Sequence, residues 1–416
     1  MGWRRRHRSS WPRAAQGLGA ALLAPAGLAL VTALFAEGPE RNRALGLIAT
    51  VSGIGFGAGA IVGGLLTGYL SWRGVFFVNV PIGALALLAA LPLLPARGVS
   101  GSEGRRAWDV GGIVLGTAGL ALLLLALTQL ATPAGGVGRA LALGGLALLL
   151  GVAFVVIERR SRDPLVPLDI FRRRGLTIAN LVALLLLAAG AILAFILTLY
   201  VQRVMGLSPI ATGLAFLPSG VGGVVGGQIA PHAVKRLGLR WSVTLGSLLL
   251  ALGCLVLLGI TAQGALAVVV IGYLIGGIGL VWTSVAATIA ATAGLERERQ
   301  GLAAGLLNTA QQLGAGIGVS LASVVATLVT QASAARGHVA ATAGDRAALA
   351  LALGLAVAAG LLAAAALRHD RGRPPPPRAR AQPQEAARGG GHVITPVAAP
   401  SRRVDLTWRW VVEMRQ

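Results

Sequence analysis

Apolar segments of membrane-spanning length recur from one end of the chain to the other, and they constrain its fold more than any other feature. Hydrophobic residues make up 55% of the 416 residues and charged residues only 12%, which is unlike a soluble protein of this length. Because lipid offers no hydrogen-bond partners, each segment is predicted to be a helix that bonds its own backbone. About eleven spans are predicted, at 14–35, 44–70, 75–94, 110–130, 138–157, 177–201, 209–230, 241–260, 264–291, 301–330 and 347–367.

The basic residues predict which side of the membrane each loop faces. One set of loops is rich in arginine, whereas the alternate set carries only Arg73, Arg139, Arg203, Arg336 and Arg346. Since basic residues concentrate in cytoplasmic loops, the first set and the C-terminus are predicted to be cytoplasmic, in the inner (cell) membrane of a bacterium. The net charge of +22 is therefore assigned to membrane topology, and nucleic-acid binding is not expected.

A glycine ladder runs through the second span. The helical period of about 100° per residue divides it into two stripes: the Gly55 stripe of Gly55, Gly59 and Gly63, and, roughly opposite, the Gly46 stripe of Gly46, Gly53, Gly57 and Gly64. Small residues let helices approach closely in lipid, so the pattern predicts a helix packed between two neighbours. Taken alone, the ladder is equally compatible with ordinary helix packing and with a functional motif.

Part of the ladder is repeated later in the chain. Glu40-Arg41 precedes Gly46–Gly59, and Glu298-Arg299 precedes a matching run, Gly305–Gly318, at a constant offset. Two related halves are typical of transporters. The alternative is a chance alignment of Gly-Leu-Ala runs, which the shared Glu-Arg disfavours.

Three motifs resemble those of the major facilitator superfamily. The ladder is similar to the family's antiporter motif on the fifth helix, with Ala60 where that motif has proline. Arg13-x-x-Gln16-Gly17-x-Gly19-Ala20-Ala21 resembles the fourth-helix motif, and residues 72–83 resemble a connector of the fourteen-helix drug:proton antiporter group. The resemblance covers nearly all of 13–367 and aligns the chain's first span with family helix four. It implies an all-α membrane protein of this fold whose N-terminal half is incomplete.

The resemblance also implies a domain division. An atypical basic leader, 1–12, precedes a partial N-terminal helical bundle at 13–95, which corresponds to family helices four to six. Two extra linker helices and a cytoplasmic connector occupy 96–176, a C-terminal six-helix bundle occupies 177–367, and a basic tail follows at 368–416. The tail's prolines and low hydrophobicity predict disorder.

Site residues follow from family positions. The arginine of the fourth-helix motif is held to take part in proton transfer, which makes Arg13 the proton-coupling candidate, although an arginine at a helix start also reaches the headgroups. The positions of helices four, nine and twelve imply a substrate cavity at Gln16, Asn180, Thr198, Trp282, Thr283 and Ser284. Amides on one face of a later helix, at Asn308, Gln311 and Gln312, are expected to bond between helices or to line the substrate path.

Catalytic chemistry is not indicated. All acidic residues fall in predicted loops, tails or span ends, including Asp345 just before the last predicted span, so no titratable group is expected deep in the membrane. Cys254 is the only cysteine, and hydrolase and metalloprotease motifs are absent. The sequence therefore predicts no metal site, no cofactor and no enzyme activity.

The sequence is compatible with three functions. The first is multidrug or small-molecule efflux by proton antiport through alternating access, with membrane lipid, a lipophilic substrate and protons as partners. The second is a truncated, non-transporting membrane fragment, and the third is a receptor or scaffold acting through its basic tail. Without a titratable group inside a span, expression of this chain alone is not expected to raise drug resistance. The sequence does not predict the oligomeric state.

Overall fold

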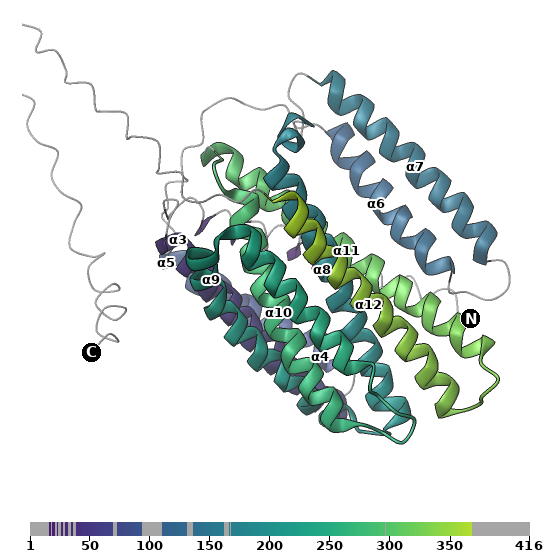
Figure 1. Cartoon of the computed structure of the whole chain (residues 1–416). Coiled ribbons are helices and arrows are strands. Elements are labelled where there is room, and N and C mark those ends of the chain that lie inside the picture. Colours follow the sequence, from purple (N-terminus) through teal and green to yellow (C-terminus); the bar gives the residue numbers. More distant parts are fainter. Residues whose placement is uncertain are drawn as a thin grey trace, which may run out of the picture. The chain divides into compact units, whose positions relative to one another are not determined.

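The computed structural model is mostly helical in the part of the chain that it describes, with turns and loops between the helices (Figure 1). It describes residues 39–69, 73–93, 110–130, 136–161, 168–295 and 297–367, with scattered positions between 16 and 35 and Val166. The predicted leader, the tail and most of the first predicted span, 14–35, lie outside these residues. Within them, nine helices are long and apolar enough to cross a membrane.

The helices follow the predicted spans closely. They are α3 (Pro39–Tyr69), α4 (Gly74–Phe77), α5 (Asn79–Leu93), α6 (Val110–Leu130), α7 (Gly136–Arg160), α8 (Arg174–Leu199), α9 (Pro209–Leu257), α10 (Leu266–Thr292), α11 (Arg297–Ala332) and α12 (His338–Ala366). A 3-10 helix, η1 (Leu168–Arg172), precedes α8, and a π-helix, η2 (Tyr200–Val204), extends it.

The predicted spans 209–230 and 241–260 are two helices that share the label α9 and are separated by a kink at Gly238, where a φ of 79° favours glycine. One predicted boundary was wrong. The last helix begins at His338 rather than at 347, because its alanine-rich first turns stay helical through Asp345 and Arg346. Asp345 therefore lies inside a membrane-spanning helix and not in a loop.

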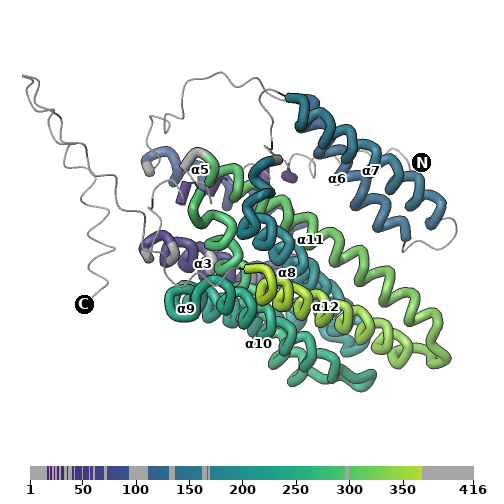
Figure 2. The backbone as a smooth tube through the Cα atoms, turned by 45° about the horizontal axis from the view of Figure 1, so that its top comes forward, coloured from purple at the N-terminus to yellow at the C-terminus, as the bar shows by residue number. Residues whose placement is uncertain are grey.

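Helix α8 is central to the described bundle. It contacts α10, α11 and α12, as the tube view shows (Figure 2), and its apolar side chains Leu186, Ile192 and Ile196 are fully buried. Burial this complete follows from its near-continuous run of leucine, alanine and isoleucine. Helices α6 and α7 form an antiparallel pair that meets the bundle through α6 and α11.

Glycines bring α9 and α10 into backbone contact. A Cβ at Gly226 would collide with the carbonyl oxygen of Ile278, and a Cβ at Gly279 would collide with the backbone nitrogen of Leu250. We call this contact the α9–α10 glycine seam. Close approach of this kind is how helices gain van der Waals contact where lipid provides no hydrophobic driving force.

The glycine ladder on α3 is packed on one side. A Cβ at Gly46 would lie 2.9 Å from the oxygen of Gly227, and one at Gly64 would lie 2.7 Å from the oxygen of Pro209, so the Gly46 stripe seats α3 on α9. Along the Gly55 stripe, an added Cβ would meet no described atom within 4 Å. The expected second neighbour is thus not seen among the described residues.

The repeated ladder on α11 uses the opposite stripe. Gly314 and Gly318 match Gly55 and Gly59 in the repeat, and a Cβ at either would collide with a carbonyl oxygen of α8, at Leu184 or at Ala188. The two copies therefore form helices of the same kind but seat them through different faces.

Tyr200 fastens η2 to the α9–α10 loop. Its side chain is fully buried; the hydroxyl donates to the oxygen of Thr261 at 2.7 Å and accepts from the nitrogen of Thr261 at 3.2 Å. Tyr200→Phe removes the partner of both backbone groups, and we expect it to lower the free energy of unfolding by about 1–3 kcal/mol. Thermal unfolding in detergent measures this. Tyr69→Phe, on a side chain that is 80% exposed, is the matched control, and an equal response of the two variants would contradict the assigned role.

Candidate functional site

A cavity of about 690 Å³ lies among α3, α8, α9, α10 and α11. Its volume is in the range of small-molecule sites. Leucine, valine, isoleucine, alanine and glycine residues form most of its wall. The polar residues on the wall are Ser52, Ser219, Tyr273, Ser284, Thr288, Asn308 and Gln311.

Neutral hydrogen-bonding groups supply the polarity of this cavity. Gln311 Nε2 donates to Ser284 Oγ at 3.3 Å, and Thr288 Oγ1 donates to the oxygen of Ser284 at 2.8 Å. Ser52 Oγ donates to the oxygen of Ile48 at 2.8 Å, which leaves its lone pairs free to accept. No charged side chain is among the described lining residues. Such a site suits a lipophilic ligand with a few hydrogen-bonding groups.

Glycines set the width of the cavity where α8 faces α10. A Cβ at Gly190 would lie 2.9 Å from Leu280 Cδ1, and one at Gly276 would lie 3.3 Å from Leu193 Cδ2. The two helices therefore interlock leucine against glycine, and a larger residue at either glycine would push a leucine into the cavity.

Three of the sequence-predicted polar residues meet in this cavity. Ser284 lines it from α10, and Asn308 and Gln311 line it from α11. The sequence predicts that the amides either bond between helices or line the substrate path. Gln311 does the first and also lines the cavity, because it bonds to Ser284 on α10 and lies on the cavity wall. Gln312, the next residue, is exposed.

The remaining predicted cavity residues lie elsewhere. Thr283 is fully buried in the α9–α10 glycine seam, where it donates to the oxygen of Gly279 at 2.8 Å. Trp282 Nε1 donates to Ser242 Oγ at 3.0 Å, and Asn180 Nδ2 donates to the oxygen of Leu176 at 2.8 Å. Gln16 is helical and exposed. Their part in substrate binding stays a prediction, as does that of Arg13, which lies outside the described residues.

A smaller pocket, of about 310 Å³, brings Thr198 together with the antiporter-motif helix. Thr198 shares its wall with Gly59, Gly63 and Gly64 of α3 and with Thr212 of α9. Gly59 and Gly63 belong to the Gly55 stripe, so part of this bare face borders a pocket. The backbone of Ala60 is helical between them.

Sequence reasoning missed four polar residues on the main cavity: Ser52, Ser219, Tyr273 and Thr288. Ser52 could have been found, because the helical period puts it on the same face of α3 as the Gly55 stripe. Tyr273 packs against Phe216 with ring centroids 4.9 Å apart, a contact between helices that the sequence does not signal.

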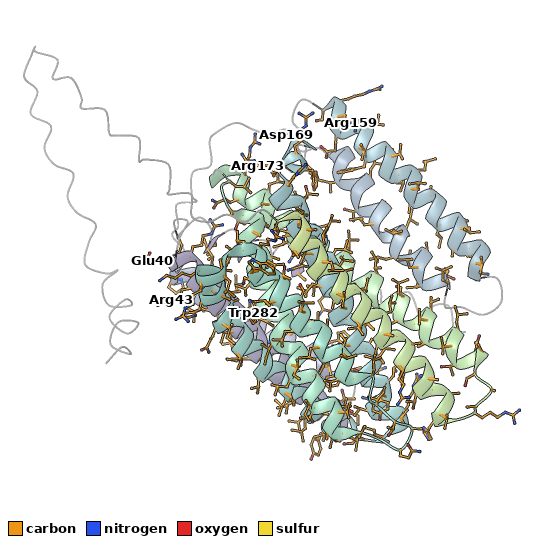
Figure 3. The ribbon with its side chains drawn as sticks, in the orientation of Figure 1. Glu40, Arg43, Arg159, Asp169, Arg173 and Trp282 are labelled. Atoms are coloured by element: carbon orange, nitrogen blue, oxygen red, sulfur yellow. The ribbon has the colours of Figure 1, made fainter. Side chains whose placement is uncertain are left out.

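Charged groups gather at one end of the described bundle. Figure 3 shows Glu40, Arg43, Arg159, Asp169 and Arg173 at that end. Arg299 and Asp169 form an ion pair at 3.3 Å, and Arg173 Nη1 donates to the oxygen of Gly294 at 2.7 Å. The arginines of these loops that the structure describes thus lie together, as expected if they face the same side of a membrane.

The sequence model of the Major Facilitator Superfamily matches residues 11–319. The chain belongs to this superfamily. The match confirms the resemblance drawn from the motifs, and with it the all-α membrane fold. It also accounts for a cavity enclosed by helices from both copies of the repeated ladder.

Similar proteins within the superfamily are named for antibiotic resistance or export. The chain is 38% identical to the puromycin resistance protein of Streptomyces alboniger, covering 77% of this chain and 64% of that protein. It is 38% identical to the cephamycin export protein of Amycolatopsis lactamdurans (78% and 67%) and 33% identical to the multidrug resistance protein Stp of Mycobacterium tuberculosis (76% and 58%). The chain thus spans about two thirds or less of the length of these relatives.

Proposed function

We propose that this chain supplies the substrate cavity of a bacterial inner-membrane exporter that moves lipophilic small molecules out of the cell. The observation that carries the proposal is the 690 Å³ cavity, whose described wall is apolar with neutral hydrogen-bonding groups. The names of the relatives support export as the direction of transport and antibiotics as the class of substrate. The same names, and the superfamily, favour transport over catalysis.

We further propose alternating access driven by protons. The repeated ladders on α3 and α11 support two related halves, which is the usual basis of alternating access. The division at 13–95, 96–176 and 177–367 is part of this proposal, with the C-terminus and the arginine-rich loops on the cytoplasmic side. Arg13 is retained as a proton-coupling residue.

A non-transporting fragment is the second candidate, since the chain spans only 58–67% of the length of the relatives compared above. It would hold the cavity without completing the transport cycle. The two candidates therefore agree on binding and differ on movement of the substrate.

Radiolabelled chloramphenicol, a neutral antibiotic, tests both the binding of a substrate and its movement across the membrane. We expect saturable binding to the purified chain, and uptake into inside-out vesicles under a pH gradient once the first three helices of a family member are joined to its N-terminus. Binding without uptake by the extended protein would favour the fragment, and absence of saturable binding by either protein would contradict the assignment of the cavity. Collapse of the pH gradient with a protonophore is the control for proton coupling.

A further inference from the structure

A second cavity, of about 430 Å³, lies among α8 with η2, α11 and α12. It differs from the main cavity because it contains charge: Asp345 on α12 and Arg203 on η2 both line it. Neutral polar residues of α11 complete its polar wall, at Ser323, Thr327, Thr330 and Gln331. We call it the Asp345 pocket.

Asp345 is buried in a membrane-spanning helix. It lies about two turns after α12 begins at His338, and only 7% of the residue is exposed. The preceding Gly344 holds α12 close to α11, because a Cβ there would collide with Thr330 Oγ1 and with the oxygen of Ala326. No described residue forms an ion pair or a hydrogen bond with the Asp345 carboxylate. Burial of a carboxylate is costly unless the charge is paired or neutralised by a proton.

Arg203 is the one basic residue among the described residues that line the pocket with Asp345. The two side chains interact electrostatically but do not form an ion pair, because their nitrogen and oxygen atoms lie more than 4.0 Å apart. Arg203 stands on the π-helix η2, and such turns are frequent at functional sites. The first residue of η2 is Tyr200. Its hydroxyl forms hydrogen bonds with the backbone oxygen and nitrogen of Thr261, and these bonds anchor η2 to the α9–α10 loop.

The other ionisable groups near Asp345 are engaged elsewhere. Tyr200 lies within electrostatic range of Asp345, and Arg346 is the next residue along the chain. The Tyr200 hydroxyl is bonded to Thr261, and Arg346 Nε donates to the oxygen of Ile260 at 2.8 Å. On α11 the lining residues are neutral, and His338 lies about two turns away at the start of α12. The charge of the pocket therefore depends on Asp345 and Arg203.

We propose that Asp345 is a proton-binding site and that its charge controls a link between α12 and η2. The charged carboxylate attracts Arg203 and holds the end of α8 toward α12. A proton taken up from water in the pocket binds a carboxylate oxygen and neutralises Asp345, which removes the attraction and widens the pocket between α8, α11 and α12. The proposal rests on the proposed function in one respect, because this residue would supply the titratable group inside a span that proton antiport requires.

Cysteine labelling tests the link without any transport assay. Cys254, the only cysteine, is buried, so Cys254→Ala with Thr327→Cys places a single thiol on the wall of the Asp345 pocket. The maleimide labelling rate is compared at about pH 5.5 and pH 8 in chains with Asp345 and with Asp345→Asn. We expect Asp345→Asn to raise the rate at pH 8 several-fold and to leave it nearly unchanged at pH 5.5.

Two further variants test whether the labelling change is specific to the attraction between Asp345 and Arg203. Asp169→Asn removes an acidic group near the other end of α8, on a side chain that is 56% exposed, and should keep the original labelling profile. Arg203→Gln removes the same attraction from the opposite side and should reproduce the fast labelling at pH 8. Equal pH profiles with and without Asp345, in variants that elute as folded protein on size exclusion, would overturn the proposal.

Infrared difference spectra test proton binding itself. Acidification should produce a carbonyl stretching band of a protonated carboxyl group that is lost in Asp345→Asn and shifted in Asp345→Glu. A spectrum unaffected by Asp345→Asn would also overturn the proposal. Both readouts are independent of chloramphenicol, so a pH-sensitive pocket in a chain that does not bind the antibiotic would contradict only the proposed function, and antibiotic binding with a pH-insensitive pocket would contradict only this inference.

Discussion

Gly279→Ala is expected to destabilise the bundle strongly. A Cβ at this position collides with the backbone nitrogen of Leu250 and lies 2.7 Å from the oxygen of Gly246. These are backbone atoms of α9, so no rotamer change relieves the overlap and α10 has to move away from α9. Overpacking of this kind costs about 1–3 kcal/mol and occasionally more. We therefore expect a larger fall in melting temperature than for alanine substitution of a helical glycine where an added Cβ would meet no described atom within 4 Å.

Tryptophan fluorescence during thermal unfolding in detergent measures the effect, since Trp282 lies on α10 beside this seam. Gly354→Ala on α12 is the matched control, because an added Cβ there meets no described atom within 4 Å. Alanine also favours the helix by about 1 kcal/mol, so the control should be neutral or slightly stabilising. A melting temperature for Gly279→Ala equal to that of the control would show that the two helices are not in backbone contact.

Ser284→Trp is expected to weaken the binding of chloramphenicol to the cavity strongly. The indole would project from α10 into the space bounded by Leu187, Gly190 and Gln311, and the bond from Gln311 Nε2 to Ser284 Oγ would be lost. A ligand that fills a cavity of about 690 Å³ cannot share it with a side chain of this size. We expect affinity to fall by at least about tenfold, which corresponds to about 1.4 kcal/mol.

Leu361→Trp is the control for the added indole. Leu361 is 64% exposed on α12, outside the cavity wall, and its replacement should leave the dissociation constant unchanged. Saturation binding of the radiolabelled antibiotic to both purified variants provides the comparison. Unchanged affinity in Ser284→Trp, with a melting temperature close to that of the original chain, would place the ligand elsewhere.

Helix positions and family were predictable because they depend on patterns local in the sequence. Apolar runs of spanning length predict helices directly, and the ladder at Gly46–Gly64 retains its spacing whatever packs against it. The predicted spans failed where hydropathy and helix formation differ. Asp345 and Arg346 lower the hydropathy at the start of α12, yet the alanines around them continue the helix.

The details of the site were less predictable because they depend on neighbours distant in the sequence. Ser284 and Thr283 are adjacent and chemically alike, but the turn of about 100° between them directs one to the cavity and the other into the α9–α10 glycine seam. Similarly, the sequence defined two glycine stripes on α3 without indicating which one α9 would occupy. Only the packed structure distinguishes these cases.

The bare Gly55 stripe makes the two faces of α3 differ in how they tolerate substitution of glycine. On the α9 side, a methyl group added at Gly46, Gly53 or Gly64 would lie 2.7–3.0 Å from a backbone atom, an overlap that no repacking of side chains can relieve. On the Gly55 side, glycine weakens the helix and gains no described contact in return. Alanine in the Gly55 stripe is therefore compatible with the packing of α3 onto α9, whereas alanine at Gly46 or Gly64 would separate the two helices.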